Sequence, residues 1–237
     1  MLKKLTLHSA AIVALSSPSF ATVIASWNFQ SPIPADATNF AVYPNAIAAT
    51  VGTGNAGGTH LSAGADWTTP VGNGSTDALG VNEWAIGDYF QFSVTTVGFS
   101  PIYVSFSQTS SNTGPRDFRL DYSSDGGATF ATGPTYSVPA NVAPNAWGSL
   151  LPVPAAFFSF DLTAVPALSN NPNDIFRLVD TSTVSANGGT VAVAGTDRVD
   201  DFTVSDSPIP APIPEPSSMV ALVSGAALLT ARRRRRG

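Results

Sequence analysis

The chain has 237 residues, no cysteine and two histidines, with a formal net charge of −5. Seven of the 11 basic residues lie near the two ends, so residues 22–213 carry four arginines, no lysine and 15 acidic residues, a net charge of about −11. That charge argues against nucleic acid and anionic membrane surfaces as partners, and the lack of cysteine excludes disulfides and thiolate metal sites.

The first 21 residues have the pattern of a secretory signal peptide. Lys3 and Lys4 form a basic start, residues 5–15 form a short apolar stretch, and Ser19-Phe20-Ala21 is a small-x-small cleavage site. We therefore expect residues 1–21 to form a signal helix that is removed on export, so that the mature chain begins at Thr22. The alternative, an amphipathic first helix of a cytosolic protein, is disfavoured because residues 23–29 are typical of a strand.

The body, residues 22–206, alternates apolar and polar side chains with a period of two, which predicts strands around four sets of residues: Phe90, Phe92 and Val94; Ile102, Val104 and Phe106; Phe118, Leu120 and Tyr122; Phe158, Phe160 and Leu162. Further strands are predicted at 23–29, 46–51, 175–179, 190–194 and 198–204. No helical period lasts three turns and no long repeat is visible. We predict one all-β domain, an antiparallel β-sandwich, in which the glycine-rich residues 52–80 form a long loop or a pair of loops that is mobile or lines a binding surface.

Catalytic groups are sparse in the body. Glycosidases usually pair two carboxylates, whereas Glu83 is the single glutamate here and the aspartates near it in sequence are more typical of a solvated loop. His60 has no cysteine, second histidine or nucleophile motif to form a triad or a zinc site. Trp67, Trp84 and Trp147 are either core residues or platforms for sugar rings. We predict that the protein is not an enzyme.

A local motif lies at residues 123–130, Ser-Ser-Asp-Gly-Gly-Ala-Thr-Phe. It resembles the Asp-box of sialidases and related secreted β-proteins, with five residues on the matching positions: Ser123, Asp125, Gly127, Thr129 and Phe130. We expect a hairpin in which Asp125 accepts backbone N–H bonds across the turn and Phe130 packs inward. The resemblance implies a structural turn that is remote from any active site.

A broader resemblance concerns residues 89–92, 118–123 and 195–202. Their strand pattern looks like that of jelly-roll domains of exported bacterial proteins, akin to carbohydrate-binding modules. In the last segment Asp200 is predicted on the core-facing row with Phe202 and Val204, where a carboxylate needs a partner. That partner is Arg198, Arg177, a backbone amide or a structural Ca²⁺, the last of which this resemblance suggests. No other cofactor is predicted.

The last residues form a sorting signal. Residues 207–213 are a proline-rich spacer, and Pro214, Glu215 and Pro216 precede an apolar run that ends at a basic block: Arg232, Arg233, Arg234, Arg235 and Arg236. This order, residues 214–237, resembles the PEP-CTERM signal of Gram-negative bacteria. The resemblance implies that an exosortase removes a short hydrophobic helix and the basic tail, after a temporary stop in the inner membrane.

These features together predict a protein that is exported by its signal peptide, transiently anchored in the membrane, and then released to the cell surface or the extracellular matrix. Its β-sandwich is expected to have a non-catalytic binding or structural role, with a polysaccharide as one candidate partner and no ligand identified by the sequence. The alternative is a carbohydrate-active enzyme or a ligand-specific polysaccharide- or ice-binding module. The shortage of glutamate and histidine in the body favours the first interpretation.

Overall fold

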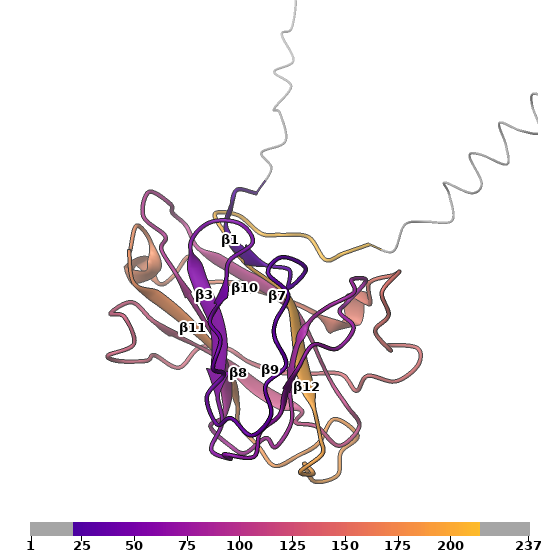
Figure 1. Ribbon diagram of the computed structural model, residues 1–237. Helices are drawn as coiled ribbons and strands as arrows, with labels where there is room; N and C mark the ends of the chain where they lie inside the picture. The colour runs from indigo at the N-terminus through magenta and orange to yellow at the C-terminus, as the bar shows by residue number, and fades with distance from the viewer. Residues whose placement is uncertain (1–20, 214–237) are drawn as a thin grey trace, which may run out of the picture.

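The computed structural model describes residues 21–213, so the predicted signal helix, the Pro-Glu-Pro motif, the C-terminal hydrophobic helix and the arginine block all lie outside the described residues. Twelve strands form two six-stranded sheets, whose ladders are all antiparallel. The two sheets face each other as the layers of a sandwich (Figure 1). The prediction of an all-β antiparallel sandwich is confirmed. No helix within residues 21–213 is long and apolar enough to cross a membrane.

The first sheet, here sheet A, has the order β10-β7-β12-β5-β4, and β1 also pairs with β12. Its strands are β1 (Val23–Trp27), β4 (Trp67–Thr68), β5 (Leu79–Val81), β7 (Tyr103–Ser110), β10 (Phe157–Asp161) and β12 (Asp197–Ser205). Two 3₁₀ turns, η1 (Pro154–Ala156) and η2 (Pro166–Leu168), flank β10.

The second sheet, sheet B, has the order β2-β3-β6-β11-β8-β9. Its strands are β2 (Ile47–Ala48), β3 (Gly54–Thr59), β6 (Tyr89–Val94), β8 (Asp117–Ser123), β9 (Thr135–Ser137) and β11 (Asp174–Asp180). The alternation that predicted β6, β8 and β11 places one row of each strand in the core and the other on the outer face of sheet B.

The core is aromatic and joins both sheets. Phe92 of sheet B stacks on Phe202 of sheet A, with ring centroids 3.6 Å apart and planes 2° from parallel. Trp27 packs edge-on against both rings, at 5.4 and 5.9 Å, and its indole N–H donates to the carbonyl of Ile47. Full burial of such side chains contributes roughly 1.5 to 3 kcal/mol each, so these three rings hold the layers together.

The structure corrects three predictions about strands. The glycine-rich residues 52–80 are not a long loop, because they contain β3, β4 and β5. Residues 190–194 are not a strand, and in place of a ladder they make single hydrogen bonds such as that from Val191 N to Thr183 O. Strand β9 was not anticipated at all. In each case the presence or absence of the strand depended on which distant segments pair with each other. The local strand propensity of a segment does not contain that information.

A bulge in β12 reverses the predicted direction of Asp200. The register between β12 and β7 shifts between Asp200 and Thr203, and Asp201 has a φ of 51°. Because of the extra residue, Val199 and Phe202 both enter the core, while Asp200 pairs with Ser107 on the outer face of sheet A. The prediction that Asp200 shares the core-facing row with Phe202 is therefore wrong.

Candidate functional site

The outer face of sheet B carries ordered rows of polar side chains. Directly opposite residues of antiparallel strands project from the same face, so the ladder registers define these rows. Three rows cross four strands: Asn55, Ser93, Ile175 and Ser123; Gly57, Gln91, Arg177 and Asp121; Thr59, Tyr89, Val179 and Arg119. The face therefore combines amides, hydroxyls, two arginines and one tyrosine, which are typical of a surface that recognises a polar ligand.

Two depressions that share Ser93 lie on the β3 side of this face, and together they are called the groove below. One depression of about 430 Å³ lies where β6 ends and β11 begins, and a second of about 280 Å³ lies over β3; both include Ser93 in their walls. Gly57 lies in the floor of the second depression, and a Cβ added there would meet nothing closer than 3.9 Å. The glycine therefore leaves open space that a ligand can fill.

Arg177 stands beside this groove, held between two aromatic rings. The centre of its guanidinium group lies 4.0 Å from the centroid of the Tyr89 ring and 3.7 Å from that of Phe130. Its Nε donates to Oε1 of Gln91 at 2.8 Å, and Gln91 itself lines the groove. Partial burial lowers the pKa of Arg177, while Tyr89 and Asp121 raise it. The group stays cationic at neutral pH and is fixed in orientation.

The carboxylate of Asp121, which lies opposite Arg177 on the neighbouring strand, is already paired with another arginine. Arg119 donates from Nε and Nη2 to the two oxygens of Asp121, at 2.6 and 2.7 Å. This two-pronged pair raises the pKa of Arg119. Since Asp121 lies between Arg119 and Arg177 in the registers, the middle of the face holds two cations and one anion.

The turn that resembles an Asp-box reaches over this face. Asp125 accepts hydrogen bonds from the Thr129 hydroxyl, the Ser123 hydroxyl and the Thr129 N–H, and the Gly127 N–H donates to the Ser123 hydroxyl. Phe130 does not pack inward as predicted, because its ring lies on Arg177 at the outer face of sheet B. The turn therefore brings a ring to the candidate site.

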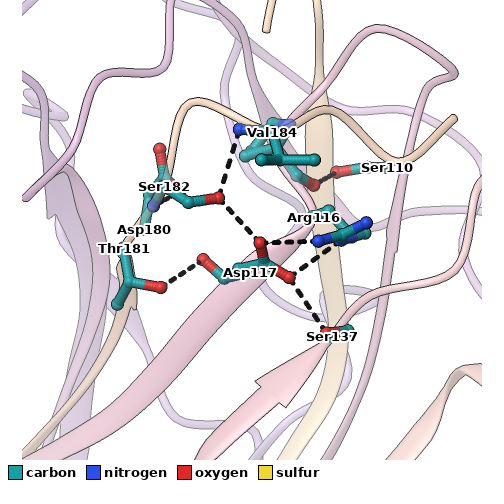
Figure 2. A network of polar contacts seen from close by, with 9 residues as sticks. Ser110, Arg116, Asp117, Ser137, Asp180, Thr181, Ser182 and Val184 are labelled. Atoms are coloured by element: carbon teal, nitrogen blue, oxygen red, sulfur yellow. Dashed lines mark hydrogen bonds and ion pairs between the residues drawn. The ribbon is translucent and has the colours of Figure 1, made fainter. Parts of the chain in front are cut away.

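Asp117 centres another polar network, at the start of β8 (Figure 2). Arg116 donates to both carboxylate oxygens, at 2.9 and 3.1 Å, and the hydroxyls of Ser137 and Ser182 donate at 3.0 and 2.8 Å. The bond with Arg116 is the main cause of the lowered pKa of Asp117. Both carboxylate oxygens of Asp117 are engaged, so this network ties β8, β9 and the turn after β11 together and leaves Asp117 no free oxygen for chemistry.

His60 and the three tryptophans singled out in the sequence are buried, whereas Glu83 is half-buried. His60 lies between Trp67 and Trp84, with ring centroids 5.2 and 4.4 Å away, and burial lowers its pKa to about 4. All four tryptophans of the chain are at most 6 % exposed, so none offers a platform for a sugar ring. The core interpretation of Trp67, Trp84 and Trp147 is the one that the structure supports.

Asp200 is covered by the loop at residues 72–75. Its carboxylate accepts hydrogen bonds from Asn73 N at 2.9 Å, the Ser75 hydroxyl at 2.7 Å and Asp201 N at 2.8 Å. Burial is the main cause that raises its pKa to about 7. Within residues 21–213 no three His, Cys, Asp or Glu side chains cluster as metal ligands would. Calcium binding by Asp200 stays a prediction, which thermal melts with and without EDTA will test.

The sequence had not singled out Tyr89, Gln91, Arg177 or Gly57 as site residues. The available signal was that two predicted strands carry polar residues on their outward rows. One of these residues, Arg177, is among only four arginines in the body. Which strands are neighbours had to be known before the rows could be aligned.

Comparison with known proteins assigns no family. No family model matches the chain, and no curated protein matches it. Among solved structures, the CBM22-2 xylan-binding domain of Paenibacillus barcinonensis Xyn10C is similar at 13 % identity and a TM-score of 0.42, covering 77 % of this chain and 98 % of that one. The C-terminal family 22 carbohydrate-binding module of Clostridium thermocellum Xyn10B is similar at 10 % identity and a TM-score of 0.41, covering 80 % and 97 %. A cleaved adhesin domain of Lys-gingipain from Porphyromonas gingivalis is similar at 9 % identity and a TM-score of 0.39, covering 78 % and 99 %.

Proposed function

We propose that the protein is an exported polysaccharide-binding protein that holds one glycan chain in the groove on sheet B, without catalysis. The observation that carries this proposal is the groove itself, two adjoining depressions that share Ser93 and are walled by hydroxyl, amide and backbone groups together with apolar side chains such as Ile175 and Val42. An extended groove suits a linear polymer, because successive units can each donate to and accept from such groups.

The lining also favours binding over hydrolysis. Among the described residues that line the two depressions, Asp174 is the sole acid, and its side chain points inward to the Thr96 hydroxyl at 2.8 Å. Hydrolysis of a glycoside usually needs two carboxylates on either side of the bond. The groove has no such pair, so the polymer would be bound and left intact.

The export part of the proposal rests on the two terminal segments. We infer that the signal peptide directs the chain across the membrane, and that an exosortase then removes the C-terminal segment and leaves the body at the cell surface or in the extracellular matrix. The two ends of the described chain support this arrangement, because they leave the same end of the sandwich (Figure 1).

The test is a pull-down of the exported chain with insoluble neutral and acidic polysaccharides. We expect at least one polymer of the panel to retain the protein, and Gly57→Val to reduce its retention at least tenfold, because the added side chain fills the floor of the groove. Ser159→Val, on exposed strand β10 of sheet A, is the matched control and should bind as the wild type does. Failure to bind any polymer, or equal loss in both variants, would contradict the proposal.

A further inference from the structure

We infer that the groove on sheet B selects acidic polysaccharides, and that Arg177 binds a uronate carboxylate of the chain; this inference rests on the proposed function. It depends on three features of Arg177: its freedom from a protein carboxylate, its fixed orientation and the local charge around it.

Arg177 and Arg198 differ from the other two arginines of the body, because neither forms an ion pair with a described carboxylate, and of these two only Arg177 lies on the outer face of sheet B. Arg116 and Arg119 each form a two-pronged pair with an aspartate, and Arg198 donates from Nη1 to the carbonyl of Val71 at 3.1 Å. Arg177 makes one hydrogen bond to a described residue, from Nε to Gln91, and no ion pair within residues 21–213. Its Nη groups therefore remain as donors for a ligand.

The two rings fix the plane of this guanidinium group. Tyr89 lies on one side of it and Phe130 on the other, at 4.0 and 3.7 Å, so its edge is what a ligand in the groove can reach. A planar fork of donors matches a planar carboxylate with two parallel N–H···O bonds. Because the side chain is already ordered, binding costs little further rotamer entropy.

The same stack argues against recognition by ring stacking alone. The ring faces of Tyr89 and Phe130 that flank the guanidinium group are covered by it and cannot stack on a sugar ring there. No tryptophan is exposed to take their place. Specificity at this point of the groove is therefore set by charge and hydrogen bonding.

The local charge also favours an anion, although the body as a whole is acidic. Arg119, Asp121 and Arg177 leave one net positive charge at the middle of the face. Asp125 is also ionised in the turn beside Phe130, but both of its carboxylate oxygens already accept hydrogen bonds from Ser123 or Thr129. Charges farther away than the screening length of about 8 Å at physiological salt act only weakly. Affinity for an acidic chain should consequently fall as salt is added.

The experiment compares polygalacturonate with its fully methyl-esterified form, which keeps the sugar chain and removes the charge. We expect the exported chain to bind polygalacturonate at least tenfold more tightly than the ester. Its affinity for polygalacturonate should fall as NaCl is raised from 50 to 500 mM, by the amount expected if binding releases about one counterion. Arg177→Gln should abolish the preference for polygalacturonate over its ester. Arg177→Lys should lose most of it, because a lysine keeps the positive charge but lacks the planar pair of N–H donors of a guanidinium group. Arg116→Gln, an arginine away from the groove, should keep it.

Equal affinity of the wild-type chain for the two polymers would overturn this inference while leaving polysaccharide binding intact. An unchanged preference in a folded Arg177→Gln variant would do the same, and would leave the stack as a packing feature. Tighter binding of dextran sulfate than of polygalacturonate would show a general anion site in place of a uronate site. Retention by neither polymer nor any neutral polysaccharide would contradict the proposed function as well. If Arg177→Gln fails to fold, the polymer pair and the salt series on the wild-type chain still decide the question.

Discussion

Asp125 and Asp174 are two carboxylates whose surroundings move their pKa values in opposite directions. Asp125 is exposed at a turn and accepts several hydrogen bonds, foremost from Thr129, which lower its pKa to about 2. Asp174 is buried at the start of β11, and burial raises its pKa to about 7. One oxygen of Asp174 accepts from Thr96, while the other has no partner among the described residues.

We predict that Asp125→Asn lowers the melting temperature at pH 7 and that the difference shrinks between pH 4 and pH 2. The folded pKa lies below the unfolded value of about 3.9, so the stabilising effect is present above that value and is lost as the pH falls through about 2. Thermal melts at pH 7, 4 and 2.5 measure it. Identical melting temperatures at pH 7 would show that the carboxylate does not stabilise the turn.

We predict that Asp174→Asn makes stability less dependent on pH. The folded pKa lies above the unfolded one, so the stabilising effect of the protonated acid is complete below about pH 4 and is lost as the pH rises through about 7. At pH 8 the variant should be more stable than the wild type by about 1 to 3 kcal/mol, since its side chain cannot ionise. Urea denaturation at pH 5 and pH 8 checks this, and an equal difference at both pH values would contradict it.

At the scale of elements, β3 shows how a strand forms from residues that do not favour one. Its sequence is Gly-Asn-Ala-Gly-Gly-Thr, and it pairs with β2 on one side and β6 on the other. The glycines on its two faces have different roles. A Cβ at Gly58 would lie 2.5 Å from the Trp67 ring, whereas a Cβ at Gly57 would lie in open groove.

We therefore predict opposite outcomes for two neighbouring substitutions. Gly58→Ala should destabilise the fold by about 1 to 3 kcal/mol, because the methyl group overpacks the core against Trp67 and the carbonyl of Tyr89. Gly57→Ala should leave stability within about 0.5 kcal/mol of the wild type. Chemical denaturation of both variants decides it, and equal effects would mean that the two faces of β3 are not distinct.

Strands β1 and β12 close the sandwich at its terminal end. The N–H of Thr22 donates to Oδ1 of Asp206 at 2.8 Å, and Asp206 N donates back to the carbonyl of Thr22 at 3.1 Å. Hydrogen bonds from Thr22 are the main cause that lowers the pKa of Asp206. If the signal peptide is removed after Ala21, the nitrogen of Thr22 becomes an ammonium group beside this carboxylate.

We predict that Asp206→Asn lowers the melting temperature more in a chain that begins at Thr22 than in one that keeps residues before it. An ion pair raises the pKa of the α-amino group above about 8, so its contribution is present below that pH and is lost as the pH rises further. Thermal melts of the wild type and of Asp206→Asn, each with and without the residues before Thr22, are compared at pH 7 and pH 10. They measure the coupling between the α-amino group and the Asp206 carboxylate. The same effect of Asp206→Asn in both backgrounds would contradict a role for the new amino group.

For the whole molecule, both ends of the described chain lie together (Figure 1). The groove lies on the outer face of sheet B. A body with about −11 charges and no lysine repels anionic surfaces, except where Arg177 and Arg119 concentrate positive charge.

We predict that mass spectrometry of the exported protein, from a host that carries the matching exosortase, finds a chain that begins near Thr22 and lacks Arg232–Arg236. The reason is the order of the Pro-Glu-Pro motif, the apolar run and the arginines, which a membrane protease can read only from a chain stopped in the membrane. A host without the exosortase is the control and should retain the basic tail. An intact basic C-terminus on the mature exported chain would contradict the prediction.

The sequence by itself determined the fold class and most long strands, because alternation with a period of two directly records which face of a strand is buried. It also contains the local patterns at both ends from which the signal peptide and the sorting signal are predicted. Tertiary structure alone decided the rest. β3 exists because β2 and β6 supply partners, the bulge at Asp201 turned Asp200 to the outer face, and the four tryptophans were drawn into the core. The candidate site depends on strand order, which brings Tyr89, Phe130 and Arg177 together from distant parts of the chain, and no local pattern encodes that order.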